Sequence, residues 1–393
     1  MSKRQSHYLQ TDLIILLILF IGVSLLAIFN AQQLEQYKGE NFVVKQVIWY
    51  GVSICILAAL QYIDLDQLYK ASMYIYIFGV LLLVILYVSP ESIAYRVNNA
   101  KSWFNFKKYD WMPLTIQPSE FMKIGLIVYL AALVNKHKEK YKQATLKTDT
   151  LLLVKISVVT IIPILFILTE PDLGTSLVIL FIGGMIIILS GIDWKIIVSL
   201  GVIVSAVTAG AVALIVKFPD FAREVVGIKP HQINRVLTWF DPTAGSDTFH
   251  IDRSMQALGS GQLFGKGMSS LQVLLPEAHT DFIFSVIGES FGFLGSAVVI
   301  LLYFLLLYKL VTLGLQIYKF NEFGAYICFG FMSLLLIHTL QNIGMTIGLM
   351  PITGIPLLLI SYGGSSILST MIGFALVYRV AVEYSIQNDY LFK

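Results

Sequence analysis

Long runs of apolar residues, separated by short polar segments, make up most of this chain. The apolar positions are continuous and do not alternate with polar ones, which predicts helices and argues against the strands of a membrane barrel. A helix needs roughly 20 mostly apolar residues to cross a bilayer. Ten runs meet this requirement, at 12–29, 45–62, 72–88, 119–134, 151–168, 173–190, 195–216, 282–308, 322–349 and 359–384.

Composition narrows the class of protein. The chain has 393 residues, of which 57% are hydrophobic and 13% are charged. A soluble domain carries about a quarter charged residues, so a soluble enzyme and a disordered chain are both excluded. The net charge of +3 is too small for the footprint of a nucleic-acid-binding protein, and we expect no nucleic-acid partner. We therefore predict an all-α integral membrane protein, with ten transmembrane helices in a single polytopic domain over 1–393.

Two of the loops between the predicted helices are long, at 89–118 and 217–281. Lys and Arg in short loops favour the cytoplasmic side, and the basic cluster 136–147 places both termini there. The large loop 217–281, between helices seven and eight, is then extracellular. The two long loops hold ten Lys and Arg residues. These are either solvated loop charges or part of an outward-facing site for an anion such as a phosphate-bearing lipid.

Ionisable residues at membrane depth are costly and indicate function by default. One such place is the segment 117–123, where Pro118 suits the first position of a helix. Glu120 and Lys123 stand three residues apart, on one helix face and within pairing distance. They are either a structural buried pair or part of a polar cavity in which Lys123 binds a phosphate.

Two further carboxylates lie near predicted helix starts. Asp172 follows a tight turn and can cap free N–H groups. Thr280 can act as the N-cap of helix eight, which puts Asp281 in its first turn. Asp281 could accept a proton from a substrate hydroxyl, but the helix dipole makes it a weak base unless desolvation or a nearby like charge offsets that effect. The alternative is that Asp281 is only a helix N-terminal residue. Glu289, two turns further in, reads as structural.

The segment 348–366 is rich in Pro and Gly, which break regular helix. Such backbone is tolerated at membrane depth where protein covers it or where it lines a wet cavity, and it contains Ser361, a candidate substrate contact. The chain has no Walker loop, zinc-ligand spacing or nucleophile elbow. The residues alone leave two classes open, a transporter and an enzyme that acts on a lipid-linked anion.

Six stretches, taken together and in order, resemble the SEDS (shape, elongation, division and sporulation) family of bacterial peptidoglycan glycosyltransferases. They are 100–104, 117–123, 171–175, 257–261, 276–284 and 351–366. Within the family, 288–293 and 355–358 look most like the elongation branch, the RodA type.

The resemblance implies the reaction and its central residue. The family's essential aspartate maps to Asp281. The growing glycan, held on undecaprenyl diphosphate, is the donor, and the 4-hydroxyl of the GlcNAc in lipid II is the acceptor. Inversion at the donor carbon gives a β-1,4 bond. Asp281 is then either the general base or a ligand of a divalent cation, Mg²⁺ or Mn²⁺, and both roles stay open.

Substrate contacts follow from the charge of the leaving group. Preorganised cations should stabilise a departing diphosphate, and Lys123, Lys101 and Arg235 are the candidates. Glu120 would orient Lys123, and Asp172 would lie beside the substrate. Trp103 would either stack on a sugar face or anchor the chain at the membrane interface.

The resemblance also implies partners and a location. The chain offers no Ser-x-x-Lys in a soluble domain, so a separate class B penicillin-binding protein must cross-link the strands. Other membrane proteins of the elongation machinery are further expected partners. The protein would work at the outer face of the bacterial cytoplasmic membrane. Two alternatives are a flippase for the lipid-linked precursor and a non-catalytic scaffold.

Overall fold

We describe a computed structural model of the chain, covering residues 9–91, 93–94, 101–105, 115–170, 172–224, 233 and 247–391. Ten long apolar helices dominate it. They are α1 (Thr11–Ala31), α2 (Phe42–Leu60), α3 (Leu65–Val88), α4 (Pro118–Lys140), α5 (Leu146–Thr169), α6 (Leu173–Leu189), α7 (Trp194–Lys217), α11 (Ile283–Ile317), α12 (Glu322–Thr346) and α13 (Gly364–Leu391). Within the described residues, nine are long and apolar enough to cross a membrane, and α6 is shorter, with 17 residues. The ten predicted helices are confirmed.

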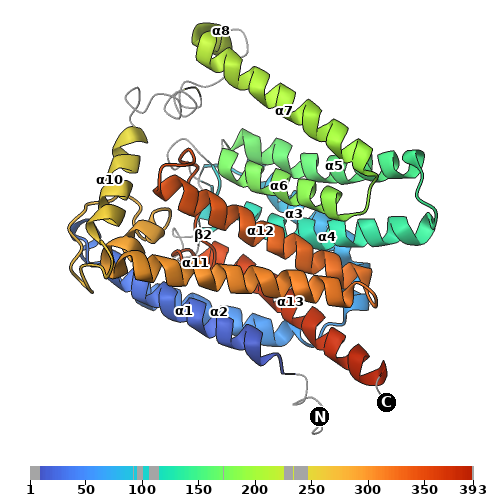
Figure 1. Ribbon diagram of the computed structural model, residues 1–393, viewed down its shortest axis with the longest axis horizontal. Coiled ribbons are helices and arrows are strands. Elements are labelled where there is room, and N and C mark those ends of the chain that lie inside the picture. The colour runs from blue at the N-terminus through green and yellow to red at the C-terminus, as the bar shows by residue number, and fades with distance from the viewer. Residues whose placement is uncertain are drawn as a thin grey trace.

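Smaller elements lie at one end of the bundle. They are the 3₁₀ turn η2 (Glu35–Tyr37), the paired strands β1 (Phe104–Asn105) and β2 (Thr115–Ile116), and the helices α8 (Pro219–Glu224) and α10 (Asp247–Ser260). The last two belong to the long loop predicted between helices seven and eight. The start of α1 and the end of α13 both lie at the opposite end of the bundle (Figure 1), as an even number of spans requires.

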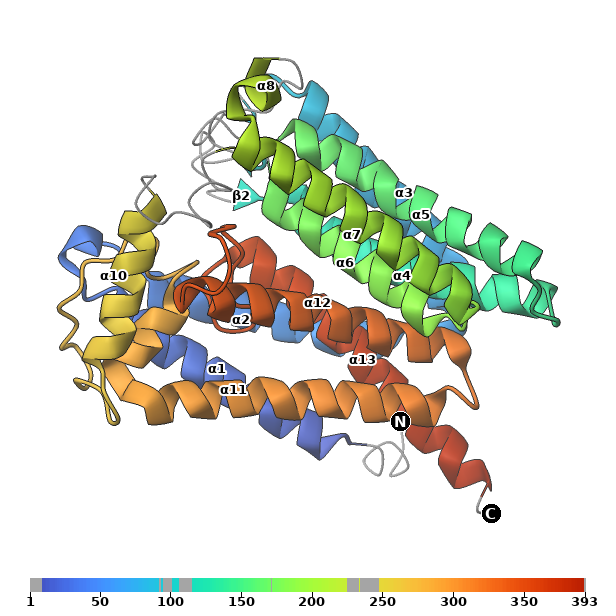
Figure 2. The same cartoon turned by 45° about the horizontal axis from the view of Figure 1, so that its top comes forward.

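The most buried helix is α12, which packs against α4, α6, α11 and α13. Figure 2 shows α3 to α7 on one side and α1, α2, α11 and α13 on the other, with α12 between the two groups. Helix α7 is the opposite case, since Ile215 is its one buried residue. An apolar helix that other protein segments leave almost entirely exposed needs lipid around it, which agrees with a membrane protein.

The first helix after the long loop, α11, bends at Gly292 (φ +67°). A Cβ at this position would lie 2.4 Å from the backbone N of Gly265, so only glycine permits the approach of the loop. The bend therefore holds the 261–267 segment against α11, close to the end where Asp281 enters the bundle.

Candidate active site

Asp281 lies in a turn that closes directly before α11. The backbone N–H groups of Thr280 and Phe282 both donate to the Glu277 carbonyl, at 3.1 and 3.2 Å. Phe282 occupies the N-cap position of α11, without a side-chain cap. The prediction that Thr280 caps the helix is wrong, because the turn ties that residue back to Glu277. Asp281 consequently precedes the first turn of the helix.

The surroundings of Asp281 make its carboxylate a usable base. The residue is half-buried, and Asn342 Nδ2 donates to its backbone carbonyl at 2.7 Å. Burial raises the pKa of Asp281 to about 7, and the charges of Glu277 and Asp172 add to this rise. The Thr280 hydroxyl acts in the opposite direction. Desolvation and like charges are both present, and either one offsets the weakening of this base by the helix dipole.

Asp172 caps α6, as predicted. Its carboxylate accepts from Thr175 N (2.9 Å) and Thr175 Oγ1 (2.8 Å), and Gln117 Nε2 lies at 3.4 Å. The residue thus acts on the site through its charge, while its own oxygens are occupied by donors.

Glu170 was not singled out from the sequence, although the Glu-Pro-Asp run at the end of a helix was the available signal. Its side chain is buried, and among the described residues no donor makes a hydrogen bond of regular geometry to either carboxylate oxygen. Burial, followed by the charge of Asp172, raises its pKa to about 8, against the smaller opposing effects of Ser102 and Lys101. Glu170 is therefore mostly protonated at neutral pH.

The expected pair of Glu120 and Lys123 is present in the core. Lys123 Nζ lies 2.8 Å from Glu120 Oε1, and the two side chains are 2% and 5% exposed. The ammonium also lies 3.2 Å from His338 Nε2. Because the protein already surrounds Lys123, this placement supports a structural buried pair over a phosphate contact.

The other predicted substrate contacts are placed as follows. Lys101 Nζ donates to the carbonyls of Tyr87 (3.0 Å) and Ser89 at the end of α3. Ser361 Oγ donates to the Thr280 carbonyl at 2.7 Å and accepts from Leu357 N at 2.8 Å. The hydroxyl thus donates and accepts within the protein and braces the Asp281 turn, and the predicted contact of Ser361 with a substrate stays a prediction.

Trp103 and Arg235 complete the predicted set. Trp103 is half-buried directly before β1. Arg235 lies outside the described residues, and its predicted contact with a diphosphate stays a prediction.

The broken backbone at 351–356, which we call the 351–356 turn, is packed against protein on one side only: Ile355 is buried, Gly354 is exposed and the other residues are half-buried. Three polar side chains on one face of α12 bind its carbonyls. These bonds join His338 Nδ1 to Pro356 (2.9 Å), Gln341 Nε2 to Pro351 (3.0 Å) and Asn342 Nδ2 to Ile355 (2.9 Å). The sequence analysis missed this face, although its i, i+3, i+4 spacing inside an apolar helix was visible.

Aromatic rings wall one side of the Asp281 turn. His279 stacks on Phe42, with ring centroids 4.3 Å apart, and its ring also contacts those of Tyr37 and Tyr362. Burial lowers the pKa of His279, so its imidazole is neutral at pH 7. The loop that carries His279 therefore folds back over the start of α2.

Glu289 is structural, as predicted. It pairs with Lys266 Nζ at 2.7 Å and accepts from the backbone N–H groups of Gln272 and Val273. A buried carboxylate with these donors fixes the segment 266–273 against α11.

Possible metal ligands are scattered across the part of the chain that the structure describes. No group of three His, Cys, Asp or Glu side chains with the spacing of a metal site occurs there. Asp281 alone could still share a hydrated divalent cation with phosphate oxygens, which is how Mg²⁺ is commonly bound.

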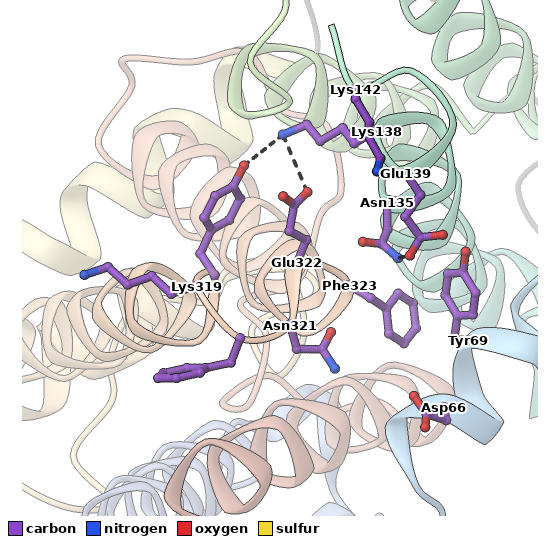
Figure 3. A pocket seen from close by; sticks show the side chains of 12 residues that line it. Asp66, Tyr69, Asn135, Lys138, Glu139, Lys142, Lys319, Asn321, Glu322 and Phe323 are labelled. Atoms are coloured by element: carbon purple, nitrogen blue, oxygen red, sulfur yellow. Dashed lines mark hydrogen bonds and ion pairs between the residues drawn. The ribbon is translucent and has the colours of Figure 1, made fainter. Parts of the chain in front are cut away.

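A cavity of about 540 Å³ lies at the end of the bundle opposite to Asp281 (Figure 3). Acidic and basic side chains line it, among them Glu139, Glu322 and Lys142. Lys138 Nζ is held there by the hydroxyls of Tyr318 (2.9 Å) and Tyr326 (2.8 Å). The basic groups of this cavity are distant from the proposed chemistry.

Comparisons with known proteins show the family of this chain. The family model for FtsW, RodA and SpoVE, described as cell cycle proteins, matches residues 8–386. The protein named peptidoglycan glycosyltransferase RodA in Treponema pallidum is 30% identical over 402 residues, covering 86% of this chain and 89% of that protein. The protein named probable peptidoglycan glycosyltransferase FtsW in Alkalilimnicola ehrlichii is 31% identical over 351 residues, covering 87% and 80%.

A solved structure has a fold similar to that of this chain. It is described as "Structural coordination of polymerization and crosslinking by a peptidoglycan synthase complex", and it matches with a TM-score of 0.74 at 26% identity. The match covers 95% of this chain and 97% of that one. The chain therefore belongs to the FtsW, RodA and SpoVE family, which is the SEDS family that its motifs resemble.

Proposed function

We propose that this chain is a peptidoglycan glycosyltransferase that polymerises lipid II into β-1,4-linked glycan, with Asp281 as the general base. The names of its relatives support the activity. One observation carries the residue assignment: Asp281 is a half-buried carboxylate with a pKa of about 7, held by its backbone beside the broken 351–356 turn, in which Gly354 is exposed. The elongation role rests on the motifs at 288–293 and 355–358.

The chemistry balances with one proton transfer. The 4-hydroxyl oxygen of the acceptor GlcNAc forms a bond to C1 of the donor sugar as the bond from C1 to the diphosphate oxygen breaks. Asp281 takes the hydroxyl proton, and undecaprenyl diphosphate leaves with the electron pair. Positioned bases contribute typically 10²–10⁴-fold to such reactions. Basic loop residues would bind the diphosphate, and Lys101 and Arg235 are our candidates.

A divalent cation is the alternative partner of Asp281. Carboxylate and phosphate oxygens suit Mg²⁺ or Mn²⁺, and the ion would arrive with the diphosphate. In that case, a chelator would stop polymerisation at every pH. If Asp281 acts as a base, polymerisation would continue in the presence of the chelator, and the dependence of its rate on pH would be unchanged.

Polymerisation by the purified protein tests the proposal. Lipid II is added to wild type, to Asp281→Asn and to Asp193→Asn, which changes an N-cap carboxylate at the opposite end of the bundle. We expect glycan chains from wild type and Asp193→Asn, and none above background from Asp281→Asn. Equal polymer from Asp281→Asn would refute the base. Movement of lipid II across proteoliposomes without any polymer would instead support a flippase.

The partner and the membrane orientation are also proposals. The matched structure is described as coordinating polymerization and crosslinking, which supports a class B penicillin-binding protein as the partner. We expect the two to co-purify from detergent-solubilised cytoplasmic membrane, together with other elongation proteins. Both termini of the protein would be cytoplasmic. If protease added to intact spheroplasts cleaves a tag fused to either terminus, this orientation is contradicted.

A further inference from the structure

A chain of buried polar groups crosses the core between α4, α12 and α13. Ser369 Oγ donates to Glu120 Oε2 at 3.2 Å, and the other oxygen of Glu120 pairs with Lys123, which in turn contacts His338. Buried ion pairs can often be replaced by apolar residues without loss of stability. Stability alone therefore does not account for this cluster.

The ammonium of Lys123 determines which ring nitrogen of His338 carries the proton. An ammonium group has three N–H donors and no acceptor. His338 Nε2, at 3.2 Å, must therefore accept from it. A neutral imidazole with an accepting Nε2 carries its hydrogen on Nδ1, which lies 2.9 Å from the Pro356 carbonyl. His338 is thus fixed as a donor to the 351–356 turn.

That turn is linked to Asp281 on two sides. Asn342 Nδ2 donates both to Ile355 O in the turn and to the backbone carbonyl of Asp281. Gly354 (φ +69°) adjoins the carboxylate itself, because a Cβ there would lie 3.3 Å from Asp281 Oδ2. A displacement of the turn at Pro356 would therefore change the position and the surroundings of the proposed base.

We propose that His338 is a positioning residue: its tautomer, set by Lys123, holds the 351–356 turn where Asp281 can take a proton from the acceptor. The inference rests on the proposed function. It also gives Lys123 and Glu120 a role that does not require either to reach a substrate. A misplacement of about 1 Å can cost about 10²-fold in rate, which sets the scale of the expected effect.

Two substitutions at His338 separate its two hydrogen bonds. In His338→Asn the amide nitrogen takes the place of Nδ1, so the bond to Pro356 O is kept and the one to Lys123 is lost. In His338→Gln the amide oxygen takes the place of Nε2, so Lys123 keeps its acceptor and Pro356 loses its donor. Ser333→Ala is the control, since that buried α12 hydroxyl donates to Phe329 O of its own helix.

We expect His338→Asn to polymerise lipid II within about 5-fold of wild type and His338→Gln to be about 30- to 100-fold slower. The acid limb of the pH–rate profile should move in His338→Gln and stay in place in His338→Asn, a change that a packing defect would not produce. Equal rates, or a faster His338→Gln, would overturn the proposal.

A second variant covers the case in which His338→Gln does not fold. Glu120→Gln/Lys123→Met removes both charges together and leaves the His338 tautomer free. We expect a rate about 10-fold lower, again with a moved acid limb. An unchanged rate and profile would overturn the proposal. If wild type itself makes no polymer, the proposed function fails and not this inference alone.

Discussion

The two aspartates at the Asp281 end of the bundle invite comparison, because both precede a helix after a turn. Asp172 accepts from Thr175 N, Thr175 Oγ1 and Gln117. Asp281 is instead held through its backbone carbonyl by Asn342, and burial beside like charges raises its pKa. Donors that satisfy a carboxylate make it a cap, whereas desolvation beside other carboxylates makes it a proton acceptor.

The largest contrast should come from removing each charge while keeping the shape. Asp281→Asn should lower the rate of polymerisation by about 10²–10⁴-fold, because the proton loses its acceptor. The rate of lipid II polymerisation at pH 8 measures this loss, and the melting temperature in detergent shows whether the variant is folded. Asp172→Asn, with its cap retained, should remain active, and equal losses in the two variants would erase the distinction between a cap and a base.

Removing the charge of Asp281 should not lower the stability of the folded protein, whereas losing the cap at Asp172 should. A carboxyl whose folded pKa is raised from 3.8 to about 7 contributes stability that declines as pH rises through that window and is constant above it. Asp281→Asn should therefore be at least as stable as wild type above pH 7. A clear fall in the melting temperature of this variant would mean that Asp281 is a structural residue.

The cap itself gives a smaller effect. Asp172→Ala removes the acceptor for Thr175 N at the start of α6 and should cost about 1 kcal/mol of stability, whereas Asp172→Asn should cost much less. Thermal unfolding in detergent compares the two variants. If Asp172→Ala is as stable as Asp172→Asn, the cap contributes nothing.

The smallest expected effect comes from the charge of Glu277, which changes the pKa of Asp281. Glu277 is exposed and raises the pKa of Asp281 through its charge. Glu277→Gln should ease ionisation and move the acid limb of the pH–rate profile to lower pH, by less than about one unit, since exposed charges are screened. Movement of the limb to higher pH would contradict the assignment of that limb to Asp281.

The membrane helices could be predicted from the sequence because each signal is local. A run of apolar residues at 12–29 or 322–349 needs no knowledge of its neighbours to read as a span, and α1 and α12 lie there. Asp172 as a cap and Glu289 as a structural residue followed equally local rules.

What the sequence did not predict depends on contacts between distant segments. The sequence left Lys123 as either a partner of Glu120 or a phosphate contact, and it did not show that His338, far along the chain, is a second partner of its ammonium. Ser361 was expected at a substrate, but its hydroxyl bonds to Thr280 O. The ring of His279 packs against rings from two distant segments, with Phe42 in one and Tyr362 in the other. Spacing along a single segment carries no information about such partners.

The pH–rate profile of lipid II polymerisation tests the central claim most directly. Initial rates of wild type between pH 5.5 and 8.5 should rise about tenfold per unit on the acid side and level off near pH 7, where Asp281 becomes ionised. Asp281→Asn should show only a low rate without that limb. A wild-type rate that is flat across this range, or the same limb in Asp281→Asn, would contradict the assignment of Asp281 as the base.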